Sequence, residues 1–368
     1  MEEIKRTPLY MKHIQCKGKM IEFAGWLMPV EYSGILLEHN AVRNAAGIFD
    51  VSHMGNVEIK GKDAEAFVQN LVTNNVAVMV NNQILYAIMC YPNGGIVDDL
   101  LVYKYNNEHF MLVINASNTE KDFQWMIDNK MEYSVDLFNI SNEMAEVALQ
   151  GPKAQEILQK ITYKNLEEIK FFFFDEIKIA GIKCIVSRTG YTGEDGFEIY
   201  TSNQGIEKIW DAILRTGKDL GVIPAGLGCR DTLRFEASLP LYGNEISQDI
   251  SPLEAGLGYF VKLDKEDFIG KAALVKQKTE GLKRKTIGFE IIGKGIPRHG
   301  YIVEKDGREI GVVTTGYMSP TLGKTIGLAL VEAEGIEIGT TIQIIIRKKA
   351  VDALVKSKKF LEKKYKKD

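Results

Sequence analysis

The sequence has 368 residues, of which 45% are hydrophobic and 26% charged, as in an ordinary folded globular protein. Its 46 basic and 49 acidic residues give a formal net charge of −3, which disfavours a nucleic-acid-binding protein because those usually carry a basic domain. The first residues lack the apolar core of a signal peptide, and no apolar run approaches the ~18 residues that a membrane-spanning helix needs. We therefore expect a cytoplasmic protein of two or three domains that binds neither nucleic acid nor a membrane.

The four cysteines are far apart in the sequence, and the five histidines are scattered. No CxxC, HxxxH or HExxH spacing occurs, so the sequence predicts neither a zinc site nor a redox dithiol. Chemistry without a metal is the expectation, with each cysteine a small buried hydrophobic residue.

The first predicted element is a helix over 35–45, with Ser33 as a possible N-cap and apolar residues at three-to-four spacing. Residues 84–115 form three strand-like runs separated by PNGG and NNEH, which predicts an antiparallel meander. This order is not a regular alternation of strand and helix, so we expect an α+β fold rather than a doubly wound parallel sheet. Further helices are expected near 118–128, 152–160 and 205–217, with a strand pair flanking 182–200.

From about residue 284 the pattern changes to short strands separated by glycine-rich turns, which predicts a small all-β barrel or sandwich. The boundary is placed near residue 280, after a helix and a charged stretch. Residues 1–280 are thus expected to form two interleaved α+β domains, and residues 281–368 a C-terminal barrel with a lysine-rich tail. Such a tail is usually only solvated, but an acidic partner could dock on it.

Adjacent aspartates in the strand-like run 96–103 are the first candidate for chemistry, because they must point to opposite faces of a strand. Strict alternation would put Val97, Leu101 and Tyr103 on the face of Asp99, and Ile96, Leu100 and Val102 on the face of Asp98. Both faces are otherwise apolar, so at least one carboxylate should lie against a core or a cleft. Solvent-facing aspartates near a turn are an equally good interpretation, and periodicity does not choose between the two residues.

The glycine-rich stretch 187–200 is followed by a strand-like FEIY instead of a helix, so it does not resemble a phosphate-binding loop. It is either a hairpin connection or a backbone that closely approaches a ligand. Arg230 follows at the start of a predicted helix, where the helix dipole disfavours a cation. An ion pair within the chain and a carboxylate of a ligand remain equally good explanations.

Taken together, nine stretches resemble the glycine cleavage T protein, or aminomethyltransferase, family. The resemblance implies a three-domain, cloverleaf-like architecture with tetrahydrofolate in a central cavity. A folate-dependent relative that maintains iron–sulfur proteins is disfavoured, because residues 239–245 lack that group's motif cysteine. A non-catalytic folate-binding protein is a further alternative. The stretches are RTPLY (6–10), FAGW (23–26), FDVSHMG (49–55), NGGIVDDL (93–100), ALQGP (148–152), SRTGYTGEDGFE (187–198), PAGLGCRD (224–231), SPTLG (319–323) and GLALV (327–331).

The resemblance implies that Asp99 is the catalytic carboxylate and that Asp98 is structural. Glu198 would bind the amino-pyrimidine edge of the pterin, since a carboxylate suits a ring edge that presents two N–H donors. Arg230 would meet the glutamate carboxylate of folate. The remaining residues expected to line the pterin and its linker are Met54, Tyr86, Tyr103, Val113, Asn115, Phe172 and Tyr191.

The implied reaction takes the one-carbon unit from an aminomethyl group on the lipoyl arm of the partner H protein. Tetrahydrofolate, as co-substrate, captures the carbon as 5,10-methylenetetrahydrofolate, and ammonia leaves. The chain departs from the family near its end, where Lys359, Phe360 and Leu361 replace the usual Pro-Phe-aromatic step. Family members often place a terminal aromatic or basic residue on the folate, and Tyr365 or Lys367 would take that place here.

Overall fold

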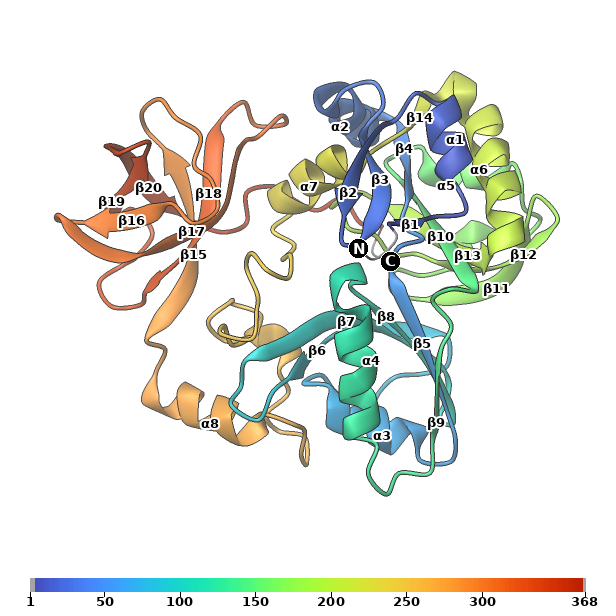
Figure 1. Ribbon diagram of the computed structural model, residues 1–368, viewed down its shortest axis with the longest axis horizontal. Helices are drawn as coiled ribbons and strands as arrows, with labels where there is room; N and C mark the ends of the chain where they lie inside the picture. Colours follow the sequence, from blue (N-terminus) through green and yellow to red (C-terminus); the bar gives the residue numbers. More distant parts are fainter. Residues whose placement is uncertain (1–3, 367–368) are drawn as a thin grey trace.

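The computed structural model describes residues 4–366 and has three lobes, one built on a six-stranded sheet, one on a five-stranded sheet and one on a closed barrel (Figure 1). The predicted α+β class, the cloverleaf-like architecture and the C-terminal barrel are therefore confirmed. Within residues 4–366, no helix is both long and apolar enough to cross a membrane. Lys367 lies outside the described residues.

The first lobe is a six-stranded sheet in the order β11-β12-β13-β10-β4-β14. Its longest helix, α6, carries Ile206, Ile209, Trp210 and Ile213 at three-to-four spacing, and all four are buried against the sheet. The elements are β4 (Ala46–Asp50), β10 (Met144–Gln150), α5 (Ala154–Gln159), β11 (Phe174–Ile179), β12 (Ile182–Ser187), β13 (Gly196–Ser202), α6 (Asn203–Gly217), β14 (Val222–Pro224) and α7 (Leu227–Glu236).

The N-terminal segment adds a small three-stranded sheet, made of β1 (Lys5–Arg6), β2 (Lys19–Phe23) and β3 (Trp26–Glu31), together with α1 (Tyr10–Gln15) and α2 (Ile35–Asn44). The predicted N-cap of α2 was wrong, because Gly34 holds that position and Ser33 lies one residue before it. The Glu38 carboxylate accepts hydrogen bonds from the backbone N–H groups of Tyr32, Ser33 and Gly34 instead. A buried side chain inside the helix thus does the work expected of a capping hydroxyl.

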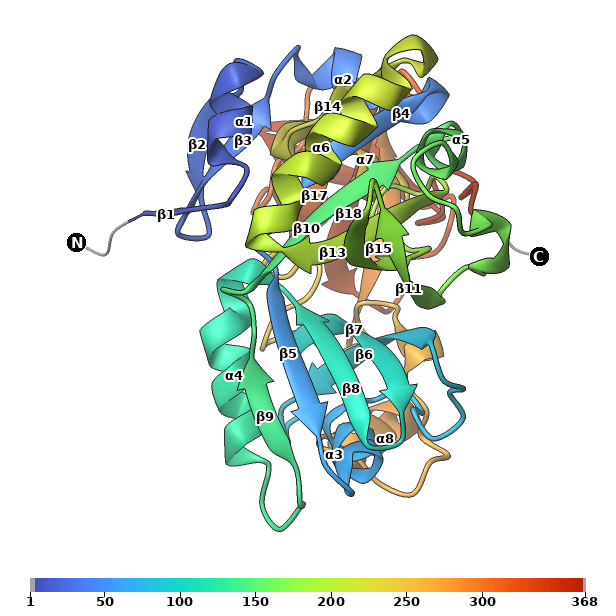
Figure 2. The same cartoon turned by 90° about the vertical axis from the view of Figure 1, so that its right-hand side faces the viewer.

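The second lobe contains the predicted meander, with sheet order β6-β7-β8-β5-β9. The chain leaves the first lobe after β4, builds this sheet and returns along β10, so neighbouring sequence segments lie in different lobes. Figure 2 shows the two sheets one above the other, with α6 on the upper lobe and α4 on the lower one. The elements are β5 (Gly55–Lys60), α3 (Ala64–Leu71), β6 (Gln83–Cys90), β7 (Ile96–Asn106), β8 (His109–Ile114), α4 (Thr119–Asp128) and β9 (Asp136–Asn139).

A bulge at the start of β7 corrects the predicted faces of this strand. Met89 pairs with Asp98 but Cys90 pairs with Ile96, so Val97 is the extra residue. Val97 consequently packs in the same core cluster as Leu100 and Val102, not on the face of Asp99. From Asp98 onward the expected alternation holds.

The third lobe is the barrel β15-β18-β17-β16-β19-β20, closed on itself by antiparallel pairs. Helix α8 (Lys271–Glu280) precedes it. The strand β20 was not expected from the sequence, although it closes the barrel between β15 and β19. The strands are β15 (Arg284–Ile291), β16 (Ile302–Lys305), β17 (Arg308–Met318), β18 (Thr325–Glu332), β19 (Thr341–Ile346) and β20 (Lys349–Lys356).

Candidate active site

An apolar cluster joins the two sheets and forms the floor of the candidate site. It combines residues of β7 and β8 in the second lobe with residues of β12, β13 and the β11 region in the first. Four of the residues expected to line a folate fall in it, namely Met54, Tyr103, Val113 and Phe172. The other members are Ile84, Leu101, Tyr105, Met111, Met144, Phe174, Ile185 and Tyr200.

Asp99 lies on β7 at the edge of this cluster, and two side chains fix its carboxyl group. The Tyr86 hydroxyl donates to Oδ2 at 2.9 Å, and the Asn115 amide donates to Oδ1 at 2.8 Å. Burial, reinforced by the negative charge of Asp98, raises the pKa of Asp99 to about 7. The group can therefore gain or lose a proton near neutral pH, as a group that exchanges protons with a substrate must.

The neighbouring Asp98 is different, because it is fully buried whereas Asp99 keeps part of its surface exposed. Asp98 accepts hydrogen bonds from the backbone and amide of Asn115 and from the amide of Asn118. Its contacts are thus with the protein's own donors. The structure in this way separates the two aspartates that periodicity left equivalent.

Glu198 lies on β13 of the opposite lobe and is 7% exposed. It accepts a very short hydrogen bond from the Thr189 hydroxyl, and burial raises its pKa. Tyr103 also points into this region, but it is fully buried, and its hydroxyl is bonded to those of Ser187 (3.0 Å) and Tyr200 (2.9 Å). Tyr103 consequently supports the floor of the site and has no free surface for a ligand.

Arg230 lies in the first turn of α7, as predicted, and its guanidinium stacks over the ring of Tyr191 at 4.7 Å. Within the described residues, Arg230 has no carboxylate in ion-pair contact. Its positive charge nevertheless acts on the buried carboxyl of Glu198. Of the two explanations that the sequence left open, an internal ion pair is therefore not seen among the described residues.

The C-terminal tail passes close to the same region. Tyr365 stacks on Phe171 with ring centroids 4.5 Å apart, and Phe171 packs edge-on against Phe172. Phe172 has φ of +61°, a strained conformation for a bulky residue that often marks a functional position. Two lysines of the tail form ion pairs within the chain. Lys364 pairs with Glu194, and Lys366 pairs with Glu167 of the first lobe.

Sequence reasoning missed a second group of buried polar residues beside Glu198 and Arg230. Glu146 faces the same side of the sheet, because it pairs with Tyr200 on β13, two residues from Glu198. Its Oε2 and the Nδ1 of His53 are buried without a hydrogen-bond partner among residues 4–366, as an absent polar ligand would leave them. The sequence feature that could have indicated Glu146 is its position as the single carboxylate in the otherwise apolar start of β10.

The protonation states of these residues suit a ligand that both donates and accepts hydrogen bonds. Burial, with the nearby Glu198, raises the pKa of Glu146 well above its ordinary value. Burial lowers the pKa of His53 to about 4, so its ring is neutral. The neutral carboxyl of Glu146, the neutral imidazole of His53 and the guanidinium of Arg230 thus lie on the same side of the candidate site.

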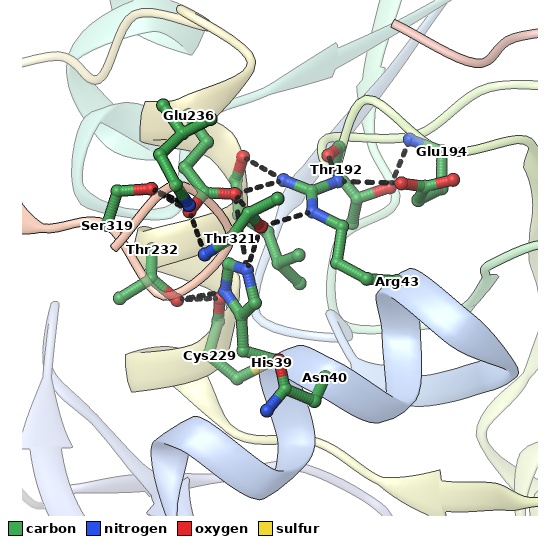
Figure 3. A network of polar contacts seen from close by, with 12 residues as sticks. His39, Asn40, Arg43, Thr192, Glu194, Cys229, Thr232, Glu236, Ser319 and Thr321 are labelled. Atoms are coloured by element: carbon green, nitrogen blue, oxygen red, sulfur yellow. Dashed lines mark hydrogen bonds and ion pairs between the residues drawn. The ribbon is translucent and has the colours of Figure 1, made fainter. Parts of the chain in front are cut away.

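A buried ionic network holds the walls of the site in place (Figure 3). Arg43 of α2 donates to Glu194 in the glycine-rich loop at 3.1 Å and to Glu236 of α7 at 2.9 Å. Glu236 also accepts from the backbone and hydroxyl of Thr321, in the SPTLG turn of the barrel, and lies 3.2 Å from His39. The network thus joins the barrel to the helix that carries Arg230 and to the loop that carries Tyr191.

Comparison with known proteins agrees with this arrangement. The "GCVT N-terminal domain" model matches residues 9–265, and the "Glycine cleavage T-protein C-terminal barrel domain" model matches residues 284–362. The chain belongs to the glycine cleavage T-protein family. A protein named aminomethyltransferase from Thermoanaerobacter pseudethanolicus is 60% identical over 368 residues, covering 100% of both chains. Another from Alkaliphilus oremlandii is 62% identical over 361 residues, which is 98% of each.

The family's fold is seen in a solved structure as well. The glycine cleavage system aminomethyltransferase T of Bartonella henselae superposes with a TM-score of 0.92 at 31% identity, covering 98% of this chain and 99% of the other. The three-lobed arrangement and the closed barrel are thus properties of the family. In this chain, residues of both sheets meet in the apolar cluster described above.

Proposed function

We propose that this chain transfers a one-carbon unit from the aminomethyl-loaded lipoyl arm of an H protein to tetrahydrofolate, with Asp99 as the catalytic carboxylate. The family supports the aminomethyltransferase activity. The observation that supports the residue assignment is the part-buried carboxyl group of Asp99, which lies at the edge of the apolar cluster and is fixed by Tyr86 and Asn115.

The reaction balances with two nucleophilic nitrogens and two leaving groups. The aminomethyl carbon loses its bonds to sulfur and to the amine, and forms bonds to the two folate nitrogens N5 and N10. Two protons leave the folate nitrogens, one going to the dihydrolipoyl sulfur and one to the departing ammonia. The products are 5,10-methylenetetrahydrofolate, ammonia and the dihydrolipoyl arm, and no oxidant or reductant is needed.

Asp99 would act on the folate nitrogens. Its pKa near 7 lets the carboxylate accept a proton from an attacking nitrogen and stabilise the positive charge that develops on the carbon-bearing intermediate. The Tyr86 and Asn115 hydrogen bonds keep the carboxyl in one orientation while this happens.

The remaining residues would bind folate. Glu198 would accept the two N–H donors of the amino-pyrimidine edge, and Arg230 would meet the glutamate carboxylate. Met54, Val113, Phe172 and Tyr191 would contact the pterin and its linker, and Tyr365 would cover the site from the tail. Tyr103 would support these contacts from behind, because its hydroxyl and ring are enclosed.

The donor would be a lipoylated H protein in the cytoplasm. Two of the tail lysines already pair with glutamates of this chain, so the tail is a weaker candidate for docking than its charge suggested. We also propose the domain division near residue 280, where α8 ends and a short connection leads to the barrel.

The test is turnover of purified protein with tetrahydrofolate and aminomethyl-loaded H protein, following ammonia and methylenetetrahydrofolate together. Wild type should form both in equal amounts, and Asp99→Asn should reduce kcat by about 100-fold or more. Folate binding without turnover by the wild type would favour the non-catalytic alternative. An unimpaired Asp99→Asn variant would refute the catalytic assignment while the function stands.

A further inference from the structure

The side-chain amide of Asn115 lies between the two aspartates of β7. Its nitrogen is 2.8 Å from Oδ1 of Asp98, 2.8 Å from Oδ1 of Asp99 and 3.2 Å from the backbone carbonyl of Asp99. One NH₂ group therefore serves acceptors on both faces of the strand. The amide can hold this position only if something fixes its rotation, because two N–H bonds are shared among three acceptors.

Asp98 supplies that constraint. Its two oxygens bind the same residue twice, Oδ2 accepting the backbone N–H of Asn115 at 3.0 Å and Oδ1 accepting the amide. The amide of Asn118 donates to Oδ1 at 2.8 Å and holds the carboxylate from the other side. Since Asp98 is fully buried, water cannot replace these contacts.

We propose that Asp98 is a positioning residue of the reaction, which acts through the Asn115 amide to orient the carboxyl group of Asp99. This proposal rests on the proposed function, because it assigns Asp98 a part in the same site. Asp98 touches no reacting atom. It holds Asn115 so that one N–H always points at Oδ1 of Asp99, while Oδ2 stays on the Tyr86 hydroxyl.

Asp98 also acts on Asp99 through its charge. The titratable groups facing Asp99 are Asp98, Tyr86 of β6 and Tyr191 of the glycine-rich loop. Those facing Asp98 from other elements are Asp122 and Tyr242, and Lys121 pairs with Asp122 at 2.6 Å.

Asparagine at position 98 would change both the geometry and the charge. Its side chain has only one oxygen to accept the three N–H donors, which are the backbone and amide of Asn115 and the amide of Asn118. The Asn115 amide would therefore lose its fixed rotation. It would also remove the negative charge that raises the pKa of Asp99. A residue that acted only through its charge would shift the titration of Asp99 to the same extent with or without Asn115, whereas a positioning residue needs the Asn115 amide.

The experiment compares wild type, Asp98→Asn, Asn115→Ala and the double variant in the turnover assay across pH 5–9. Asp98→Asn should lower kcat by about 10- to 100-fold, leave KM for folate within about threefold, and move the kcat midpoint to lower pH by about one unit. Because both residues act in one chain of contacts, the double variant should lose little more than either single variant.

Asp122→Asn is the matched control. It changes another buried aspartate beside Asp98, but one that makes no contact with Asn115. Burial, with Asp98, raises the pKa of Asp122 to about 10, so an uncharged asparagine leaves the local charge unchanged. We expect it to keep kcat within about threefold and the pH midpoint of the wild type, whatever it costs in stability.

A titration of the Asp99 carboxyl by ¹³C NMR needs no turnover, so it can be read in the single and the double variants even if Asp98→Asn has little activity. The resonance should titrate at lower pH in Asp98→Asn than in wild type. An unshifted titration, or additive losses in the double variant, would overturn the positioning role. A wild type without turnover would refute the proposed function instead, and comparison of the titrations in the single and double variants would still show whether Asp98 acts through Asn115.

Discussion

Replacing Glu236 with glutamine tests whether the buried network of Figure 3 holds the barrel against the rest of the molecule. Glu236 is fully buried and receives donors from two parts of the chain, helix α2 and the SPTLG turn of the barrel. Arg43 of α2 binds it at 2.9 Å, the Thr321 hydroxyl of the barrel at 2.6 Å, and the Thr321 backbone at 3.0 Å. Glutamine has nearly the same shape, so the variant removes the charge and one acceptor without opening a cavity.

The expected loss follows from these contacts. Arg43 is 6% exposed and would keep its ion pair with Glu194, so the loss should be smaller than the about 3–5 kcal/mol that a buried charge without any partner costs. The glutamine NH₂ group would also face donors that now point at a carboxylate, and the cost of this mismatch is part of the same loss. We therefore expect the free energy of unfolding to fall by about 2–3 kcal/mol at pH 7.

The assay is urea unfolding followed by circular dichroism, in which this loss lowers the midpoint by about 1 M. Glu332→Gln is the control, since Glu332 pairs with Arg308 at 2.6 Å but both side chains are exposed. That variant should lose less than about 1 kcal/mol. Equal losses in the two variants would refute the claim that burial gives the network its strength.

The pH dependence supplies a second check. Burial alone would raise the pKa of Glu236, but the hydrogen bond and charge of His39 and the hydroxyls of Ser319 and Thr321 lower it to about 2. A depressed folded-state pKa stabilises the protein above the unfolded value and loses that effect as pH falls through the folded one. The difference between wild type and Glu236→Gln should thus be constant above about pH 5 and shrink towards pH 2.

Asp99→Asn should stabilise the protein at alkaline pH. The raised folded-state pKa of Asp99 contributes stability that is fully present below pH 3.8 and is lost as pH rises through about 7. Relative to wild type, the gain at pH 8 over pH 4 should be about 4 kcal/mol in urea unfolding, and no gain would refute the burial of this charge. Glu198→Gln should weaken tetrahydrofolate binding by about 10- to 100-fold in a fluorescence titration, since one charge-assisted hydrogen bond is lost. An unchanged affinity would show that Glu198 does not bind the pterin. Tyr365→Ala should raise KM for folate by about tenfold with little change in kcat, because the ring stacked on Phe171 is lost. An unchanged KM would show that Tyr365 packs on Phe171 without contributing to folate binding.

Local signals in the sequence were strong enough to predict most of the elements. Apolar residues at three-to-four spacing predicted α2, and turn residues between short apolar runs predicted the meander and most of the barrel. The family motifs supplied the three-lobed architecture and the candidate site. These features depend on the pattern within each segment, so no knowledge of distant contacts was needed.

The sequence could not determine features that depend on distant partners. The bulge at Val97 exists because β6 and β7 pair out of step there, and this changed the face on which Val97 lies. The pairing of β20 with both β15 and β19, which closes the barrel, is likewise a feature of the tertiary structure. The start of α2 likewise depends on Glu38, whose carboxylate also binds the backbone of Gly226 at 2.9 Å, 188 residues away.

The two aspartates show the same division within the candidate site. The sequence determined that both carboxylates would lie in an apolar strand, and alternation placed them on opposite faces. Only the tertiary structure gave Asp98 its three donors and gave Asp99 the Tyr86 hydroxyl, because Asn115, Asn118 and Tyr86 come from other elements. The chemical difference between two identical neighbouring residues is set by which groups the fold brings to each of them, and those groups are not encoded locally.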